Sequence, residues 1–342
     1  MKGDESENMP KISAIMPVYN SEKYIAETMD SILGQTYTDF EFLIVNGAST
    51  DRTREIIESY KDKRIQLYNL KIDKGVGYAS NFAVQKATGR YIARVDADDI
   101  YHPDRFLLQK EYLDNNPEIV AVKSLYEYFA DEDLDDKERF ESMQNFGAES
   151  KNKIISPEDI SEKLYWNMCL PNNVTMIRAE ILKKVYYGEM RCGEDYYLFY
   201  NLNKKGYKIG TVTQYLVRQR ISNGSITAKY KNECFEAFYI IKSDIIIPLF
   251  KKGKVFIWGA GSFGELVNNI LKKYFLKVEG YIDSDPQKYG SIIGGFRVFP
   301  PKMLRDKGKK KILVASQPGK YAIAKELEAM GYKHIEDYVV FF

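Results

Sequence analysis

The chain has 342 residues, of which 44% are hydrophobic and 29% charged, and its formal net charge is +2. This length predicts two domains, and the small net charge gives no reason to expect a nucleic-acid partner. Only two histidines occur, which argues against a histidine metal cage or a serine-type triad. Three cysteines without metal-ligand spacing indicate reduced thiols of a cytosolic protein. No apolar run is long enough to span a membrane, and the polar first nine residues resemble neither a signal peptide nor an anchor.

Residues 11–123 alternate short apolar runs with amphipathic segments, which is the pattern of a parallel α/β sheet. We expect strands at 11–16, 40–45, 64–68 and 91–95, with Pro17 ending the first strand. Helices are expected at about 21–33, 51–60 and 78–87. The acidic stretch 127–141 predicts a solvated loop, and further strand-like runs lie at 174–177 and 215–217.

A second α/β pattern occupies the C-terminal part of the chain. A helix predicted from about 232 to 250 leads into it. Strands are expected at 255–258, 278–282 and 311–315, one helix is expected to follow the glycine-rich run 259–264 and to end at about residue 274, and another is expected at 321–330.

Three carboxylates, Asp96, Asp98 and Asp99, follow the fourth predicted strand. Burying so many like charges without a counterion is costly. Mg²⁺ or Mn²⁺ usually takes one or two carboxylates together with substrate phosphates, and Asp96 and Asp98 lie on the same side of an extended chain. In open α/β sheets ligands bind at the carboxyl ends of strands, which favours a metal site facing a phosphate. The alternative is that Asp98 or Asp99 only caps the helix starting near Pro103.

Five short motifs occur in order along roughly residues 11–225. They are residues 16–20 (MPVYN), 46–53 (NGASTDRT), 73–75 (DKG), 87–89 (ATG) and 96–99 (DADD). Together they resemble the inverting glycosyltransferase family 2. The resemblance implies the GT-A fold, a nucleotide diphosphate sugar as donor, a divalent metal ion and inversion at the anomeric carbon.

The resemblance also assigns roles to single residues. Pro17 and Tyr19 would line the base and ribose pocket. Asp96 would face the ribose or the metal, and Asp98 would bind the metal. Asp99 would face the donor sugar or support the site.

Two further positions in the nucleotide region carry alternatives. Lys74 would lie near the nucleotide, or it is a solvated loop lysine. Asn46 stands where the family normally has an Asp that accepts from the base. Its amide oxygen can still accept, but without charge assistance. The base and the donor sugar are therefore left open.

Glu194 and Asp195 precede a helical run of apolar and aromatic residues and resemble the family's Glu-Asp motif. Asp195 would be the general base that takes the proton of the acceptor hydroxyl, with Glu194 on the acceptor side. The alternative is that both acids only favour a helix N-terminus. Relatives often carry a His after this helix, whereas this chain has Arg218 and Arg220. Either arginine would balance the leaving diphosphate, or both are surface arginines.

The second α/β pattern contains Gly259, Gly261 and Gly264 between a strand and a helix, and Asp283 ends the next strand. This is the context of the dinucleotide fingerprint. Residues 280–286 resemble the small Rossmann-like domains of sugar-modifying acyltransferases, which implies a nucleotide-sugar ligand. The alternative is a module that serves only packing or dimerisation.

A lysine cluster lies near the C-terminus, at Lys307, Lys309, Lys310 and Lys311. It could contact anionic lipid headgroups as a peripheral membrane site. A solvated loop is the expected interpretation.

We therefore expect an α/β protein with a GT-A domain at 1–228, a helical connector at 229–252 and a smaller Rossmann-like domain at 253–342. By resemblance, it is a metal-dependent hexosyltransferase acting on a glycan or lipid-linked glycan in bacterial surface polysaccharide synthesis. It would work in the cytoplasm or at the inner face of the membrane. A non-catalytic nucleotide-sugar-binding protein and a nucleotidyltransferase are the alternatives, and a homo-oligomer stays open.

Overall fold

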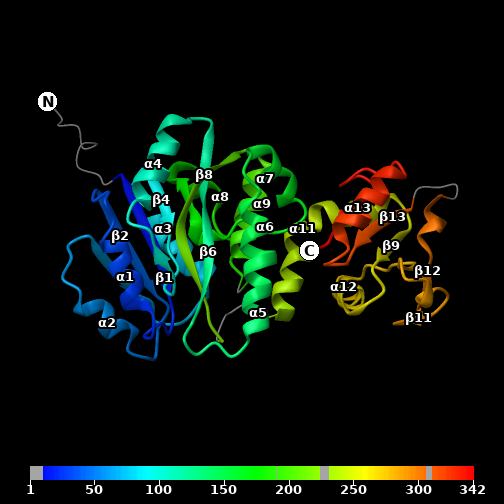
Figure 1. Cartoon of the computed structure of the whole chain (residues 1–342), viewed down its shortest axis with the longest axis horizontal. Coiled ribbons are helices and arrows are strands. Elements are labelled where there is room, and N and C mark those ends of the chain that lie inside the picture. The colour runs from blue at the N-terminus through cyan, green and yellow to red at the C-terminus, as the bar shows by residue number, and fades with distance from the viewer. Residues whose placement is uncertain (1–10, 191, 224–230, 306–309) are drawn as a thin grey trace. The chain divides into compact units, whose positions relative to one another are not determined.

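The computed structural model describes residues 11–190, 192–223, 231–305 and 310–342 (Figure 1). The chain divides into two compact units. The N-terminal unit comprises Met1–Leu164 and Met168–Lys231, and the C-terminal unit comprises Tyr165–Asn167 and Asn232–Phe342. Within the described ranges, no helix is both long and apolar enough to cross a membrane.

The N-terminal unit is built on one eight-stranded mixed sheet in the order β3-β2-β1-β4-β7-β6-β8-β5. Its first half is parallel and consists of β3 (Ile65–Asn69), β2 (Phe40–Asn46), β1 (Ile12–Val18) and β4 (Tyr91–Arg94). β7 (Thr175–Arg178) runs antiparallel between β4 and β6 (Ile119–Ala130). β8 (Lys208–Ile221) is parallel to β6, and the short β5 (Ile100–Tyr101) closes the edge.

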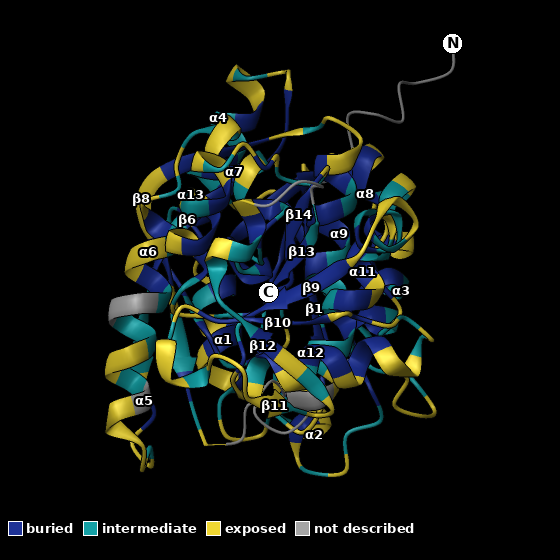
Figure 2. Cartoon of the chain, turned by 90° about the vertical axis from the view of Figure 1, so that its right-hand side faces the viewer, coloured by how far each residue is buried: buried dark blue, intermediate teal, exposed yellow. Residues whose placement is uncertain are grey.

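The helices of this unit connect the strands. They are α1 (Ile25–Leu33), α2 (Thr53–Ser59), α3 (Val76–Lys86), α4 (Arg105–Asn115), α5 (Lys137–Ser142), α6 (Glu149–Asn152), α7 (Pro157–Leu164), α8 (Ala179–Val185) and α9 (Glu194–Lys204). A π-helical segment, Met143–Ala148, joins α5 to α6, and a 3₁₀ turn covers Asn172–Val174. β1 and β2 are buried along their whole length (Figure 2), as expected for parallel strands covered on both faces.

β1 continues through Pro17, which we expected to end it. The carbonyl of Ile15 accepts from the Val95 N–H at 2.9 Å on the β4 side. Because alternate residues of a strand face the same neighbour, Pro17 also faces β4. The register with β4 ends at Ile15 and Arg94, so the missing N–H of proline removes no registered pair and the strand tolerates it.

The acidic stretch 127–141 is not the solvated loop that we expected. β6 extends through Ala130, and the N–H of the buried Asp131 donates to the carbonyl of Ile221 at 2.9 Å. Helix α5 then begins at Lys137. A run of acids shows only local charge, whereas the partners that bury Asp131 come from distant parts of the chain.

The C-terminal unit contains a six-stranded sheet in the order β11-β12-β10-β9-β13-β14. Five strands are parallel: β12 (Phe296–Phe299), β10 (Gly280–Ile282), β9 (Val255–Trp258), β13 (Lys311–Val314) and β14 (Tyr338–Val340). β11 (Ile292–Ile293) is antiparallel. The helices are α11 (Lys231–Lys252), α12 (Ser262–Lys273) and α13 (Lys320–Ala329), and 3₁₀ turns lie at Pro286–Lys288 and Pro301–Arg305. The predicted class, two α/β units of which the second is smaller, is confirmed.

Lys242 of α11 is fully buried in this unit. Its Nζ donates to the carbonyls of Trp166, Val340 and Phe341, at 2.6, 2.9 and 3.1 Å. Burial lowers the pKa of Lys242 well below its ordinary value, and a buried polar group is tolerated when it is hydrogen-bonded. This lysine therefore fixes the inserted segment Tyr165–Asn167 and the end of β14 to one point of the core.

The glycine-rich turn between β9 and α12 is tightly packed at one position and open at another. Gly259 has a φ of +122°, which favours glycine. A Cβ atom on Gly264 would lie 1.8 Å from the carbonyl oxygen of Gly259, whereas one on Gly261 would meet nothing within 4 Å. Gly264 is therefore required for the close approach of helix and turn, and Gly261 is not.

We expect Gly264→Ala to lower the free energy of unfolding of the C-terminal unit by on the order of 2 kcal/mol or more, because the backbone must shift. Gly261→Ala has room for its methyl group and should cost less than about 1 kcal/mol. Scanning calorimetry on the full chain measures both. Equal losses in the two variants would contradict the packing argument.

Candidate functional site

The acidic turn, residues 96–99, follows β4 at the carboxyl edge of the parallel half-sheet. β1 ends at Val18 and β2 at Asn46, and these two residues are paired in register. The predicted nucleotide-pocket residues therefore meet the acidic turn at one sheet edge. Tyr19 is 49% exposed there and presents its ring to solvent, which leaves it free to contact a ligand.

Arg94 and Asp96 form an ion pair at the end of β4. The Arg94 Nη2 lies 2.8 Å from the Asp96 Oδ1, and the Arg94 side chain is 4% exposed. Residues two apart on a strand share a face, which explains the pairing. The Asp96 carboxylate thus has a buried arginine as its ion-pair partner.

Asp98 and Asp99 have different surroundings. Burial, and then repulsion from Asp96, raise the pKa of Asp98 to about 6. Asp99 is 3% exposed and accepts from the side chain of Asn173 and, at 2.9 Å, from the N–H of Arg220. Of the two roles expected for Asp99, its burial fits support of the site rather than contact with a sugar.

Arg220 braces the acidic turn from β8. Its Nε donates to the Asp98 carbonyl at 3.0 Å, and its guanidinium pairs with Glu27. The rings of Tyr24 and Phe129 lie 4.6 and 4.4 Å from it. The side chain is only 9% exposed. Arg220 is therefore not a surface arginine but is engaged within the protein, and its contact with a diphosphate stays a prediction. Arg218, the other candidate, pairs instead with Glu127 at 3.1 Å.

Asp131 joins this network, and sequence reasoning missed it. Its carboxylate accepts from Lys23 and from the Tyr24 hydroxyl, both at 2.6 Å, and Arg220 lies 3.7 Å away. Lys23 and Asp131 are 108 positions apart, so no local signal links them.

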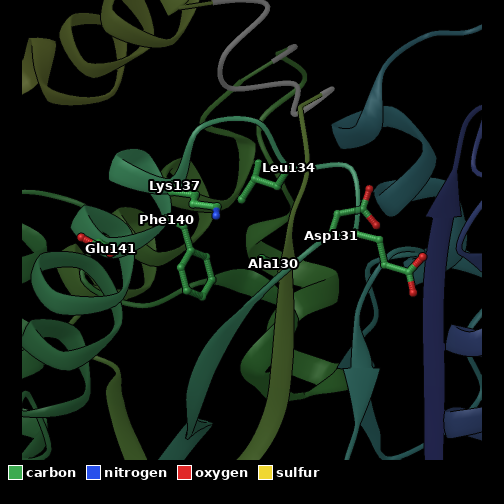
Figure 3. A pocket seen from close by; sticks show the side chains of 7 residues that line it. Ala130, Asp131, Leu134, Lys137, Phe140 and Glu141 are labelled. Atoms are coloured by element: carbon green, nitrogen blue, oxygen red, sulfur yellow. The ribbon is translucent and has the colours of Figure 1, made fainter.

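A recess of about 320 Å³ lies beside the C-terminal end of β6 (Figure 3). It is lined by Ala130, Asp131, Glu132, Leu134, Lys137, Phe140 and Glu141.

Asn173 and Gln219 were also missed. Gln219 donates to the Asn173 oxygen at 2.6 Å, and Asn173 donates in turn to Asp99. This chain of amides holds the buried carboxylate from β8 and from the 3₁₀ turn before β7. Isolated amides in a sequence give no signal of such a chain.

Glu194 and Asp195 open α9, after Gly193 at a φ of +80°. Burial, and then the charge of Asp195, raise the pKa of Glu194 to about 8. Burial also raises the pKa of Asp195, with Asp96 adding to the rise and Arg94 opposing it. The start of α9 and the acidic turn are therefore one electrostatic neighbourhood. The sequence predicted these residues, and the fold brings them together.

Asn46 and Lys74 are engaged within the protein. The Asn46 side chain is 2% exposed, accepts from the Ser49 N–H at 3.0 Å and donates to Asn69 at 2.9 Å. It therefore holds the turn after β2. The Lys74 ammonium lies 4.4 Å from the centre of the Tyr78 ring.

In the C-terminal unit, Asp283 holds the glycine-rich turn. It accepts from the N–H groups of Ala260, at 2.8 Å, and Asp285, at 2.9 Å, and pairs with Lys288 at 3.1 Å. Burial raises the pKa of Asp283, but these partners outweigh it and the net direction is downward. Both oxygens are thus used within the protein, as the packing interpretation of this motif requires.

The lysine cluster is partly used in structure. Lys311 pairs with Asp337 at 2.6 Å, and Lys310 donates to the Met303 carbonyl at 3.1 Å. Lys307 and Lys309 lie outside the described residues.

The raised pKa of Glu194 predicts a pH-dependent stability. Its usual value is 4.5 and its folded value about 8. The folded chain thus keeps a proton that the unfolded chain releases, and stability should fall as pH rises from about 4.5 to about 8. Glu194→Gln cannot titrate, so its melting temperature should fall less than that of wild type across this window.

Thermal melts in EDTA without nucleotide measure the effect. Glu180→Gln, at an exposed first-turn glutamate of α8, is the control and should follow wild type. Parallel curves for wild type and Glu194→Gln would refute the assignment.

Comparison with known proteins places this site in a family. Residues 13–186 match the model of glycosyl transferase family 2, and residues 251–336 match the family described as C2185-like, N-terminal. An uncharacterized glycosyltransferase of Methanocaldococcus jannaschii is 32% identical over 240 residues, or 68% of this chain and 79% of the relative. The putative teichuronic acid biosynthesis glycosyltransferase TuaG of Bacillus subtilis is 29% identical over 222 residues, covering 64% and 82%.

Solved structures show the same fold. Staphylococcus aureus TarS, solved as residues 1–349 with UDP-GlcNAc, superposes with a TM-score of 0.55 at 22% identity, over 69% of this chain and 66% of that one. The mannosyltransferase PcManGT of Pyrobaculum calidifontis, solved with GDP-Man and Mn²⁺, gives 0.52 at 20%, over 70% and 65%. The chain thus spans just under two thirds of each solved chain. The family model matches half of the chain, and the predicted site residues lie at the carboxyl edge of the parallel strands. The protein therefore belongs to glycosyl transferase family 2.

Proposed function

We propose that this glycosyltransferase moves a sugar from a nucleotide diphosphate sugar to an acceptor hydroxyl with inversion at the anomeric carbon. The observation that carries the proposal is the electrostatic proximity of Asp195, at the start of α9, to Asp96, after β4. One site thereby combines a diphosphate-facing acidic turn with a candidate base. TarS and PcManGT, solved with UDP-GlcNAc and GDP-Man, support a nucleotide sugar as donor.

Asp195 is proposed as the general base. The acceptor oxygen bonds to the anomeric carbon, its proton passes to the Asp195 carboxylate, and the bond to the diphosphate breaks with release of nucleoside diphosphate. A base works best when its pKa approaches the working pH, and the pKa of Asp195 is shifted upward by burial. Glu194, whose pKa is about 8, would remain largely protonated at neutral pH and leave Asp195 as the anion.

A divalent cation suits the acidic turn when substrate completes its shell. No group of three or more His, Cys, Asp or Glu side chains in the described part of the chain could hold a metal by itself. Mg²⁺ and Mn²⁺ sites commonly use one or two carboxylates plus phosphate oxygens. Asp98 fits because its carboxylate forms no ion pair among the described residues and its pKa stays raised although the charges of Arg220 and Arg94 oppose the rise, whereas Asp96 is paired with Arg94. When bound, such an ion neutralises charge on the leaving diphosphate.

The nucleotide would lie across the ends of β1 and β2, against the exposed Tyr19, and Pro17 would shape this pocket from its buried position in β1. Asn46 would shape this pocket through its turn, because its own amide oxygen already accepts from Ser49. The acceptor is proposed to be a glycan or lipid-linked glycan of a bacterial surface polysaccharide. The name of TuaG, a putative teichuronic acid biosynthesis glycosyltransferase, supports this class.

A panel of nucleotide sugars, each with and without Mn²⁺, tests the function on the full chain. We expect one donor to raise the melting temperature with Mn²⁺ and to yield nucleoside diphosphate. Metal-dependent binding without turnover of any donor would instead indicate a non-catalytic binding protein. Pyrophosphate as product would indicate a nucleotidyltransferase.

Asp195→Asn should reduce the rate of sugar transfer by about 10²-fold or more, which is the usual contribution of a general base. The affinity for the donor should stay within about threefold of wild type. Discontinuous assays of released nucleoside diphosphate measure the transfer rate, and isothermal titration calorimetry with the donor measures its affinity. Asp159→Asn, at an exposed first-turn aspartate of α7, is the matched control and should keep full activity. Transfer that survives Asp195→Asn unchanged would rule out this base.

Asp98→Asn should separate metal binding from stability. Burial raises the pKa of Asp98 to about 6, so at pH 8 its charge costs folding energy without metal. The variant should melt at or above wild type in EDTA, yet lose the Mn²⁺-dependent shift with nucleoside diphosphate. Asp133→Asn, at an exposed acid outside the turn, should behave as wild type. An unchanged Mn²⁺ shift in Asp98→Asn would remove Asp98 from the metal site.

A further inference from the structure

Arg94 is a buried charge at the last position of β4. Placing a guanidinium in a protein interior is costly unless its charge and its N–H groups find partners. The family motifs do not include this residue, and the proposed chemistry gives it no direct contact with substrate. Its contacts therefore require a separate explanation.

Two of its contacts are with the strand end itself. Nη2 pairs with the Asp96 carboxylate and Nη1 donates to the Val95 carbonyl, each at 2.8 Å. The next bond of the β1–β4 ladder would run to that Val95 carbonyl from residue 17, but Pro17 has no N–H. Arg94 thus satisfies a carbonyl that the proline leaves open and, with the same guanidinium, grips the first carboxylate of the acidic turn.

The guanidinium also faces the start of α9. Its charge lowers the pKa of Glu194 and of Asp195, and that of Asp98 as well. It is therefore a cation shared by the acidic turn and the base helix. Its Nε is buried and has no hydrogen-bond partner within the described ranges. One N–H donor of the guanidinium is therefore left unsatisfied, so the pairing with Asp96 is not explained by a need to satisfy every donor.

The strand beneath Arg94 is itself fixed. The fully buried Arg105 of α4 donates to the carbonyl of Arg94 at 2.9 Å and to that of Thr175 at 3.1 Å. The backbone that carries the guanidinium is thus clamped between β4 and β7. A side chain on so rigid a base can hold Asp96 in one orientation.

We propose that Arg94 is a positioning residue for glycosyl transfer, which fixes the Asp96 carboxylate and supplies the positive charge between the acidic turn and Asp195. The inference rests on the proposed function, because it assigns Arg94 to the same donor site. Arg94 acts through Asp96 and Asp195 and does not touch the reacting atoms.

The matched control is Arg178, the last residue of β7, which is also buried. Its hydrogen bonds within the described ranges go to the Tyr91 hydroxyl and to the carbonyls of Ile119, Leu113 and Asn116. Arg178 thus resembles Arg94 in burial but pairs with no carboxylate there. Arg178→Lys therefore measures the loss of stability and activity caused by replacing a buried arginine that has no carboxylate partner among the described residues.

The experiment compares full-length wild type, Arg94→Lys, Arg94→Gln and Arg178→Lys below their melting transitions, with the donor found in the panel. We expect kcat to fall about tenfold in Arg94→Lys, which keeps the charge but loses the two-pronged grip, and about a hundredfold in Arg94→Gln. Arg178→Lys should keep kcat within about twofold despite a lower melting temperature. If Arg94→Gln does not fold, the lysine variant carries the comparison.

A pH profile separates positioning from mere stability. Asp195 interacts electrostatically with Asp96, Glu194, Lys151, Tyr187 and Arg94. Only the last changes, so the acid limb of kcat/KM should move to higher pH in Arg94→Gln and stay in place in Arg178→Lys. Equal kcat values and equal pH profiles in the Arg94 and Arg178 variants would overturn the proposal.

A binding readout keeps this test apart from the test of function. Calorimetry with uridine and guanosine diphosphates and Mn²⁺ should show affinity at least about fivefold weaker in Arg94→Lys than in Arg178→Lys. If wild type turns over no donor, the proposed transfer fails, and the Arg94 inference is then judged on this affinity alone. Equal affinities would reject it.

Discussion

Carboxylates at the edge of a buried sheet need positive charge, and the N-terminal unit is organised to provide it. Arg94 meets the acidic turn from the strand that precedes it, and Arg220 braces the same turn from β8. Lys23 then compensates Asp131, the acid next to Arg220. Each cation is held by aromatic rings, carbonyls or carboxylates, so the protein itself provides partners for these side chains. Asp98 is also buried in this turn, and its pKa stays raised although the charges of Arg220 and Arg94 oppose the rise.

This arrangement gives the acids of the site separate roles. Asp96 is held in an ion pair by Arg94, and Asp99 is buried behind a chain of amides through Asn173. Asp98 is proposed to bind a metal ion, and Asp195 is proposed to take the acceptor proton. In the C-terminal unit, by contrast, both carboxylate oxygens of Asp283 accept hydrogen bonds from the backbone of the turn that it closes. A carboxylate is available for chemistry only where the protein does not already use it.

Much of the fold followed from local patterns. The parallel strands of the N-terminal half and the strands β9, β10 and β13 lie where apolar runs predicted them. The outer strands β12 and β14 were not predicted, because Phe296–Phe299 and Tyr338–Val340 are short runs without a clear period. Pro17 was misjudged since its effect depends on which neighbour its nitrogen faces. The acids near 131 were misjudged because their partners are remote in sequence.

The sequence by itself determined the family, the α/β class and the acids on which the chemistry is proposed to rest, because strand periodicity and short motifs are local properties of the chain. Only the tertiary structure decided which polar groups are already occupied. Asn46, Arg220 and Asp283 were candidates for ligand contact in the sequence, and the structure shows that each is engaged within the protein. Arg94 belongs to none of the sequence motifs, and the role proposed for it follows only from its contacts with β1, β4 and α9 in the fold. The physical reason is that burial and charge compensation depend on the surroundings of a side chain, which come from segments that the fold alone brings together.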